Sequence, residues 1–399
     1  MLGAFELYYP VVMSLVWIIG SIFYILVKKK PKPVRKELQP SVEILMSCFN
    51  EEQVLEACVK TLVDLDYENY TITLIDDKST DNTVEVMRKL RDKYPQVKVI
   101  ESQENLGKAE ELNRGLEQSR ADYILCVDAD AIFDQHALSH LVATMEDNRK
   151  LGAVTGRPIV KNTKTVIGKL QYLEYIMNID FIKRAQDMLS NNILTVSGVI
   201  VLYRREALLD IKGWNTEVLT EDIDATWRLY RADWNVGYQP EALCYIYVPE
   251  TIRGFIKQRT RWARGGIEVF LNRFKEIPQL TLGRQFLSLD IIFSYAWVFA
   301  VTFSTICLGF EFVFLKNLML RLDILVIYYA TTLMFYLASR IVNFKHDFIR
   351  YPHSFFLYLP VFFYAYWLNN IVVVFSAFYH MFDRSKYAAW GDSDRGTIE

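Results

Sequence analysis

The sequence lacks a charge bias, a disulfide framework and both common glycine-rich phosphate motifs. Its 399 residues include 45 Lys and Arg and 47 Asp and Glu, which does not support bulk attraction to nucleic acid, so no nucleic-acid partner is expected. The five cysteines form no C-x-x-C pair, and their odd number argues against a full set of disulfides. Neither G-x-G-x-x-G nor G-x-x-x-x-G-K-[ST] occurs, so any nucleotide is bound in another way.

The N-terminus has the features of a retained membrane anchor and lacks those of a signal peptide. Residues 7–27 read LYYPVVMSLVWIIGSIFYILV without a charge, and roughly 20 apolar residues cross a bilayer as a helix. The basic run KKKPKPVRK follows this stretch, whereas a signal peptide carries its positive charge before the apolar run. Because cytoplasmic flanks are rich in Lys and Arg, we expect the N-terminus outside and a cytosolic domain from residue 28.

Three further apolar stretches lie near the C-terminus, at about 291–310, 324–343 and 355–379. They predict a C-terminal membrane region over 276–382 with about three spans, followed by a polar tail at 383–399. Asn369 and Asn370 lie within the last stretch, and polar groups at membrane depth face other helices or a wet cavity. Contacts between helices and a channel lining are both open interpretations of these two residues.

Between the apolar ends, short apolar runs alternate with amphipathic stretches. The runs at 42–49, 71–76, 97–100 and 123–128 are typical of strands, and the stretches between them have helical periodicity. This alternation predicts a mostly parallel α/β sheet, in which ligands bind beyond the carboxyl ends of the strands. Acidic residues follow three of these strands, in the segments CFNEE, IDDKSTDNT and VDADA.

Asp128 and Asp130 form a D-x-D motif at the end of the strand predicted over 123–128. Residues i and i+2 of an extended segment point the same way, so both carboxylates can face one hard divalent cation. A capping turn is the alternative, but the position after a buried strand favours a Mg²⁺ or Mn²⁺ site. At the other two strand ends, Glu51, Asp76 and Asp77 can accept hydrogen bonds from a ribose or a uracil, or serve as turn and capping residues.

Two later motifs each have a structural and a catalytic interpretation. Thr220-Glu221-Asp222 opens a helical stretch, where acids can cap the helix or supply a general base. The segment Gln258-Arg259-Thr260-Arg261-Trp262 precedes the C-terminal spans. Its arginines and tryptophan can anchor the chain at a membrane interface, or clamp a diphosphate and stack on a sugar. His136 and His140 are four residues apart, but no HExxH is formed, which favours an ordinary helix face.

The ordered series CFNEE, IDDKSTD, ENLGKAEELNRGL, VDADA, TED and QRTRW resembles the family 2 processive glycosyltransferases over about residues 40–270. That family includes cellulose, chitin, hyaluronan and poly-N-acetylglucosamine synthases. The single N-terminal span, the segment VPETIRGFIKQRTRWARGG and the tail YAAWGDSDRG are most similar to the poly-β-1,6-N-acetylglucosamine synthases of biofilm-forming bacteria. The resemblance implies a GT-A (Rossmann-like) catalytic domain at 41–275 inserted between transmembrane helices, after an anchor at 1–27 and a basic linker at 28–40.

The resemblance also implies a role for each matching residue. Asp222, preceded by Glu221, would be the catalytic base, and Asp128 and Asp130 would hold Mg²⁺ or Mn²⁺ on the diphosphate. The substrate-binding residues would be Glu51, Asp76, Asp77 and Lys108 for the UDP-sugar, and Gln258, Arg259, Arg261 and Trp262 for the diphosphate and the glycan end. Lys78 departs from the family, in which glycine is common after the paired acids. With its side chain in solvent, we expect this change to have no effect.

The expected reaction is processive, inverting transfer of N-acetylglucosamine from UDP-GlcNAc to a growing β-1,6-linked glycan. It would take place at the plasma membrane, with a cytosolic catalytic domain in a multi-pass chain and a small accessory subunit, for biofilm exopolysaccharide. The alternatives are a hyaluronan-, chitin- or cellulose-like synthase, a transferase that adds one sugar to a lipid, and a membrane transporter with a nucleotide-sensing domain. The sequence alone decides neither the sugar nor the linkage.

Overall fold

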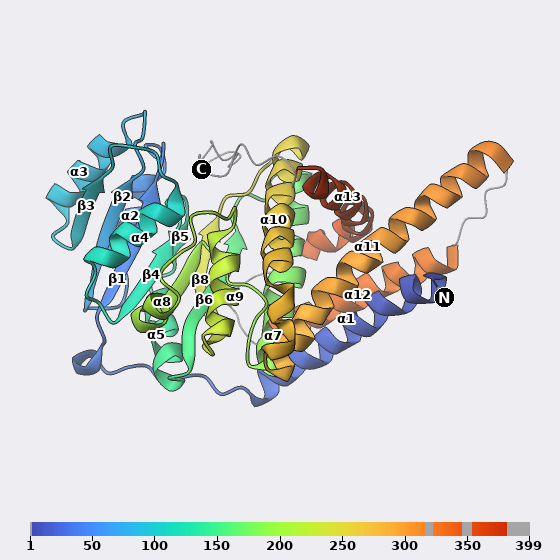
Figure 1. The fold of residues 1–399 in the computed structure, drawn as a ribbon, viewed down its shortest axis with the longest axis horizontal. Helices are drawn as coiled ribbons and strands as arrows, with labels where there is room; N and C mark the ends of the chain where they lie inside the picture. The colour runs from blue at the N-terminus through green and yellow to red at the C-terminus, as the bar shows by residue number, and fades with distance from the viewer. Residues whose placement is uncertain (1, 316–321, 345–352, 381–399) are drawn as a thin grey trace.

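The computed structural model describes residues 2–315, 322–344 and 353–380. A sheet domain lies at one end of the molecule, and the long apolar helices extend from its other side (Figure 1). The predicted polar tail at 383–399 lies outside the described residues, as does the tail segment YAAWGDSDRG.

The domain is built on one eight-stranded sheet in the order β3-β2-β1-β4-β7-β6-β8-β5. β1, β2, β3 and β4 pair in parallel, β7 runs antiparallel to both its neighbours, and β8 is parallel to β6. The sheet is therefore mixed. Its first half is parallel as expected, and in its second half only β6 and β8 are parallel neighbours. The strands are β1 Val42–Cys48, β2 Tyr70–Asp76, β3 Val97–Glu101, β4 Tyr123–Val127, β5 Ile132–Phe133, β6 Leu151–Val160, β7 Ile200–Arg204 and β8 Asn235–Ile246.

Helices cover both faces of this sheet, because its central strands are apolar on both sides. All seven residues of β1 are buried, as expected of a strand covered on both faces. One face carries α2 Leu55–Val63, α3 Thr83–Lys93 and α5 Ala137–Asp147. The other carries α4 Lys108–Gln118, α8 Arg205–Asp210 and α9 Glu221–Arg231.

A long helix with an internal π-helical segment connects the sheet domain to the membrane helices. It consists of α6 Val166–Glu174, the segment Tyr175–Phe181 and α7 Ile182–Ser190, and ends at Asn191 in a left-handed conformation. Buried residues of this helix, among them Phe181 and Ala185, form one apolar cluster with residues of α1, α12 and α13. The sequence analysis did not predict this element.

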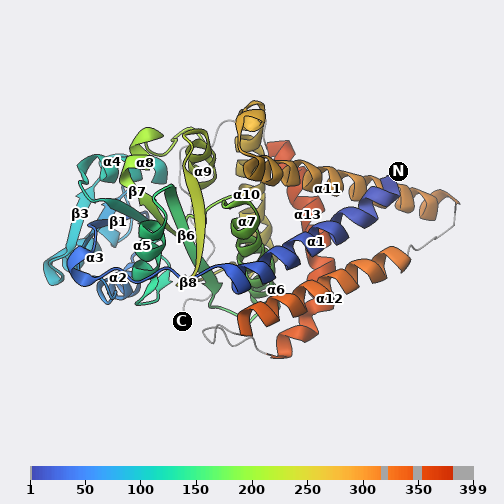
Figure 2. The same cartoon turned by 90° about the horizontal axis from the view of Figure 1, so that it is seen from below.

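The apolar helices are α1 Leu2–Val27, α11 Leu282–Leu315, α12 Leu322–Phe344 and α13 Leu359–His380. Three of them contain segments long and apolar enough to cross a membrane, and a bent pair at 354–363 and 368–379 can add a fourth. In both views α10 Ile252–Arg273 lies between the sheet and these helices (Figures 1 and 2). Short helices complete the described chain at Lys36–Leu38, Phe274–Gln279 and His353–Tyr358.

Helix α11 is longer than the span predicted from 291, because its first turns pack on the sheet domain. The Arg284 guanidinium is buried and donates to the backbone oxygens of Tyr230 and Trp234, each at 2.9 Å. At 1.5 Å per residue its 34 residues extend about 51 Å, against about 30 Å for the bilayer core. The extra length therefore joins the membrane region firmly to the domain.

Candidate active site

The carboxyl ends of β1, β2 and β4 lie next to one another, because these strands are parallel neighbours in the sheet. This order places Glu51, the Asp76–Asp77 pair and the D-x-D motif along one edge of the sheet, as the sequence predicts for a ligand site.

Asp77 holds the loop that leads into α4. Its carboxylate accepts hydrogen bonds from the backbone N–H groups of Leu106, at 2.7 Å, and Gly107, at 3.0 Å. Burial raises the pKa of Asp77 to about 6, although these two hydrogen bonds oppose the shift. Asp76 accepts from the backbone N–H of Ser79 at 3.1 Å and closes the preceding turn. Both carboxylates thus have structural partners, and their contact with a nucleoside stays a prediction.

Lys108 joins the D-x-D motif to the T-E-D motif. Its Nζ lies 2.6 Å from Asp128 Oδ1 and 3.2 Å from Glu221 Oε1. Burial alone would lower the pKa of Lys108, but these two carboxylates hold it well above its usual value. A charged ammonium, one strand-end acid and the first residue of α9 therefore meet at one point of the sheet edge.

Asp128 and Asp130 have the chemistry of a site that shares a cation with its substrate. Both are partly exposed, and the Asp128 side chain has 33% of its surface accessible although Lys108 binds one of its oxygens. Within 2–315, 322–344 and 353–380, no group of three or more His, Cys, Asp or Glu side chains is arranged to hold a metal ion. Two carboxylates are enough for Mg²⁺, which usually completes its shell with water and substrate phosphates. The pair therefore fits a metal brought in with a diphosphate.

Asp222 is fixed by two backbone hydrogen bonds at the start of α9. Its Oδ1 accepts from the N–H of Ile223 at 2.8 Å, and its Oδ2 accepts from the N–H of Gly198 at 3.0 Å. Burial and the neighbouring Glu221 carboxylate raise the pKa of Asp222 to about 6, while Lys108 opposes the shift. A carboxylate that binds a proton near neutral pH and is held in one orientation suits a general base.

Glycines allow two segments to approach the T-E-D motif closely. A Cβ at Gly198 would lie 2.9 Å from Asp222 Oδ2, closer than carbon and oxygen normally pack. A Cβ at Gly265 of α10 would collide with the side chain of Thr220. The start of α9 is therefore enclosed between the Gly198 turn and α10.

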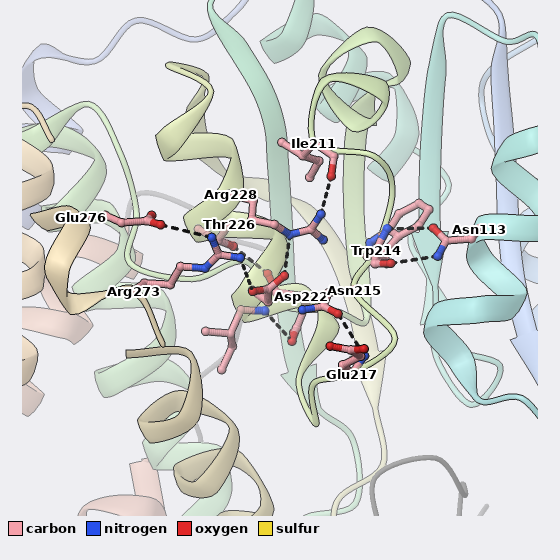
Figure 3. A network of polar contacts seen from close by, with 12 residues as sticks. Asn113, Ile211, Trp214, Asn215, Glu217, Asp222, Thr226, Arg228, Arg273 and Glu276 are labelled. Atoms are coloured by element: carbon pink, nitrogen blue, oxygen red, sulfur yellow. Dashed lines mark hydrogen bonds and ion pairs between the residues drawn. The ribbon is translucent and has the colours of Figure 1, made fainter. Parts of the chain in front are cut away.

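A buried ion-pair network ties α9 to the end of α10 (Figure 3). Asp224 accepts from Arg228 at 2.5 Å and lies 3.2 Å from Arg273, the last residue of α10. Arg228 also donates to the backbone oxygen of Ile211, and Thr226 Oγ1 donates to the backbone oxygen of Asp222 at 2.8 Å. These contacts make α9 and α10 one unit behind Asp222.

The residues of the QRTRW segment point in different directions from α10. Arg259 is buried and forms an ion pair with Glu174 of α6, while its guanidinium lies 4.2 Å from the centroid of the Trp262 ring. Tyr366 of α13 also donates to Glu174, at 2.5 Å. Arg261 is exposed, and Gln258 and Trp262 are partly buried. Arg259 thus connects α6, α10 and α13, and Arg261 is the arginine of the segment that is open to a ligand.

His136 and Lys78 occupy surface positions. His136 is exposed and its Nδ1 lies 3.2 Å from Asp66, in agreement with an ordinary helix face. Lys78 is exposed as expected, but its φ of 59° lies in the left-handed region. Glycine adopts that conformation without strain, which explains why glycine suits this position.

Several residues around the site were not found by the sequence analysis. They are Glu174, Lys183, Ser197, Gly198, Asp224 and Gly265. Asp224 lies two residues after Asp222 and could have been suspected from that spacing. The others act across long sequence separations, and no local pattern marks them.

Comparison with known proteins shows which family the chain resembles. Residues 43–212 match the family described as glycosyl transferase family 2. The chain is 36% identical over 417 aligned positions to a poly-beta-1,6-N-acetyl-D-glucosamine synthase of Staphylococcus epidermidis, covering 99% of this chain and 98% of that protein. It is 38% identical to the synthase of the same name from Staphylococcus aureus strain COL, covering 74% of this chain and 73% of the other.

A solved structure shares the fold at low sequence identity. A mannosyltransferase from Pyrobaculum calidifontis, determined with GDP-Man and Mn²⁺, superimposes with a TM-score of 0.71 at 16% identity. The match covers 97% of this chain and 100% of that one. At this identity the likeness shows the GT-A fold alone. The matched family model and the staphylococcal relatives show that the chain belongs to glycosyl transferase family 2 and is similar to the poly-beta-1,6-N-acetyl-D-glucosamine synthases.

Proposed function

We propose that this chain polymerises N-acetylglucosamine from UDP-GlcNAc into a β-1,6-linked glycan at the inner face of the plasma membrane. The observation that carries the proposal is the junction at Lys108, where the D-x-D motif meets the helix that bears Asp222. Near full-length similarity to named synthases supports the product class, because the relatives align through the membrane helices as well as the sheet domain.

The chemistry is a single displacement. Asp222 accepts the proton of the C6 hydroxyl at the glycan end, the hydroxyl oxygen attacks the anomeric carbon, and the bond from that carbon to the UDP oxygen breaks. Because the attack occurs once, the configuration inverts from α to β. Gly198 and Ile223 hold the carboxylate, so little reorganisation is needed when the proton moves.

Charge on the departing diphosphate requires preorganised cations. Lys108 supplies one charge beside Asp128, and the exposed Arg261 can supply another from α10. Asp128 and Asp130 would hold Mg²⁺ or Mn²⁺, which when bound neutralises phosphate oxygens. The partly exposed carboxylates of Asp128 and Asp130 are the protein ligands that this arrangement offers.

The membrane arrangement follows from the basic linker. Lys28 pairs with Asp187 of α7, and Lys30 lies 2.5 Å from Glu241 of β8. The positively charged end of α1 is thereby tied to the catalytic domain, which supports a cytosolic domain under the rule that basic flanks stay inside. The small accessory subunit is a further expectation from the family resemblance.

Turnover of radiolabelled UDP-GlcNAc by the purified chain in lipid nanodiscs tests the proposal. A long glycan that remains at the origin of a thin-layer plate is expected, whereas UDP-glucose and UDP-glucuronic acid should give none. A single-sugar lipid product would favour the lipid-linked transferase, and no turnover in the presence of Mg²⁺ or Mn²⁺ would reject an enzyme that acts alone.

A further inference from the structure

The turn formed by Ser197 and Gly198 presents the N–H that orients Asp222. The Gly198 N–H donates to Asp222 Oδ2 at 3.0 Å, and the Ile200 N–H donates to the Ser197 carbonyl at 3.0 Å. From the sheet side, Thr155 Oγ1 accepts from the Ser197 N–H at 3.0 Å. Any shift of this turn would therefore move the carboxylate of Asp222.

A buried lysine holds the same turn from the opposite side. Lys183 of α7 is 8% exposed, and its Nζ donates to Ser197 Oγ at 2.5 Å. Its ammonium also lies 5.9 Å from the centroid of the Tyr238 ring. Burying an ammonium costs free energy unless the charge is paired, so a function for Lys183 beside this turn would explain why it is there.

The part of the helix that carries Lys183 is fixed by a charged cluster one helical turn earlier. Asp180 is almost fully buried and binds Arg184, at 2.9 Å, and Arg157, at 3.0 Å. Tyr238 donates to the same carboxylate at 2.8 Å. Asp180 lies within the π-helical segment Tyr175–Phe181, a distortion that is frequent at functional sites.

Membrane helices reach this cluster directly. Asn343 of α12 accepts from Arg157 at 2.9 Å and is itself buried. The Arg184 guanidinium lies 5.9 Å from the ring centroid of Tyr24, near the inner end of α1. Contacts therefore lead from α12 to the Asp180 cluster and, through the Tyr238 ring and the helix backbone of α7, to Lys183 and the Ser197 turn.

We infer that Lys183 is a positioning residue for the catalytic base, which fixes the Ser197–Gly198 turn and connects Asp222 to the membrane helices through the Asp180 cluster. The inference rests on the proposed role of Asp222. It assigns to α7 a task in the chemical step, in addition to its packing against α1.

The charged groups around Asp222 and Lys183 determine in which direction the pKa of Asp222 changes when Lys183 is replaced. Asp222 faces Glu221 on its own helix, Lys108 of α4, Tyr203 of β7 and Lys183 of α7. Lys183 faces Asp222, Asp180 and Cys244, and burial lowers the pKa of Lys183 to about 8. The ammonium favours the charged form of Asp222, so its removal raises the proton affinity of the base.

The test measures polymer synthesis against pH for Lys183→Met, Lys183→Arg and Ser197→Ala, with exposed Lys89→Met as the matched control. Lys183→Met should lower kcat about tenfold, keep KM for UDP-GlcNAc within about twofold, and move the acid limb of kcat/KM up by about one pH unit. Lys183→Arg should restore the acid limb. Ser197→Ala should lower kcat and leave the acid limb of kcat/KM at its wild-type pH. The control should match the wild type.

A loss of rate in Lys183→Met at every pH without a shift of the limb would overturn the inference, and so would a wild-type kcat in Ser197→Ala. The Arg and Ala variants keep the test decisive if Lys183→Met fails to fold. Failure of the proposed function is recognised separately, because the wild type would then make no polymer or Asp222→Asn would keep its activity.

Discussion

At the residue scale, the proposed chemistry depends on Asp222, whose neighbours set both its orientation and its proton affinity. Asp222→Asn keeps the shape of the side chain but cannot accept the proton, and its NH2 group cannot accept one of the two backbone hydrogen bonds. We expect kcat to fall about 100-fold or more, with UDP affinity within about threefold, because general base catalysis contributes about 10²–10⁴. Turnover and calorimetric UDP binding check this, with exposed Asp147→Asn as the control; a variant with more than half the wild-type rate would remove Asp222 from the base role.

The pH profile gives the same residue a second test. A base must be deprotonated, so a pKa near 6 predicts that kcat/KM is maintained above that value and falls tenfold per unit well below it. Asp77 titrates in the same range, but it holds the loop before α4. Asp77→Asn should therefore weaken UDP binding and leave unchanged the acid limb of kcat/KM that is due to Asp222. A wild-type profile that is flat down to pH 4.5 would contradict the assignment of Asp222 as the base.

Metal removal tests the D-x-D pair. EDTA should abolish polymer synthesis, and excess Mg²⁺ or Mn²⁺ should restore it, because two carboxylates repel a diphosphate unless a cation binds between them. Asp130→Ala should raise the metal concentration needed for half-maximal activity, measured by titration with Mn²⁺. Full wild-type activity in EDTA would exclude a metal role for both aspartates.

The motif residues could be predicted because each chemical type follows a recognisable strand or helix signal. Asp128 follows a buried strand and Asp222 opens a helix, and the structure connects the two motifs through Lys108. Lys183 and Gly198 could not be predicted, because their partners lie 14 and 24 residues away and are brought together only by the packing of α7 and α9.

At the scale of elements, α10 is the connection between the sheet and the membrane helices, and its two arginines have different tasks. Arg259→Met removes the cation that pairs with the largely buried Glu174, to which Tyr366 still donates, and should cost about 3–5 kcal/mol of stability. Arg261→Met on the exposed side should leave stability unchanged and raise KM for UDP-GlcNAc. Thermal unfolding in detergent and donor kinetics separate the two, and equal loss of stability in both variants would contradict the division.

The elements themselves were predicted unevenly. The strands β1 to β4 agree with the sequence analysis to within one residue at each end, because buried parallel strands read as continuous apolar runs. The second half of the sheet, from β7 to β5, and the helix from α6 to α7 were missed. Their burial comes partly from membrane helices more than 100 residues away in the chain, which local periodicity does not report.

At the scale of the whole molecule, the N-terminal end of α1 lies away from the sheet, toward the far end of α11 (Figure 1). This arrangement agrees with a cytosolic domain and an external N-terminus. Cysteine labelling tests it in a Cys307→Ser background, because the other four cysteines are buried. A Cys introduced at Lys36 should react with an impermeant maleimide only in opened cells, and reaction in intact cells would reverse the proposed topology.

Linkage analysis of the product is the most direct test of the central claim, that the site around Lys108 and Asp222 builds a β-1,6-linked N-acetylglucosamine polymer. The purified wild-type chain in nanodiscs would be supplied with UDP-GlcNAc and Mg²⁺ or Mn²⁺, and its product methylated and hydrolysed. The account predicts 6-substituted N-acetylglucosamine as the main derivative, with β-anomeric protons in the intact polymer. A 4-substituted derivative, or a product limited to one sugar on a lipid, would contradict it.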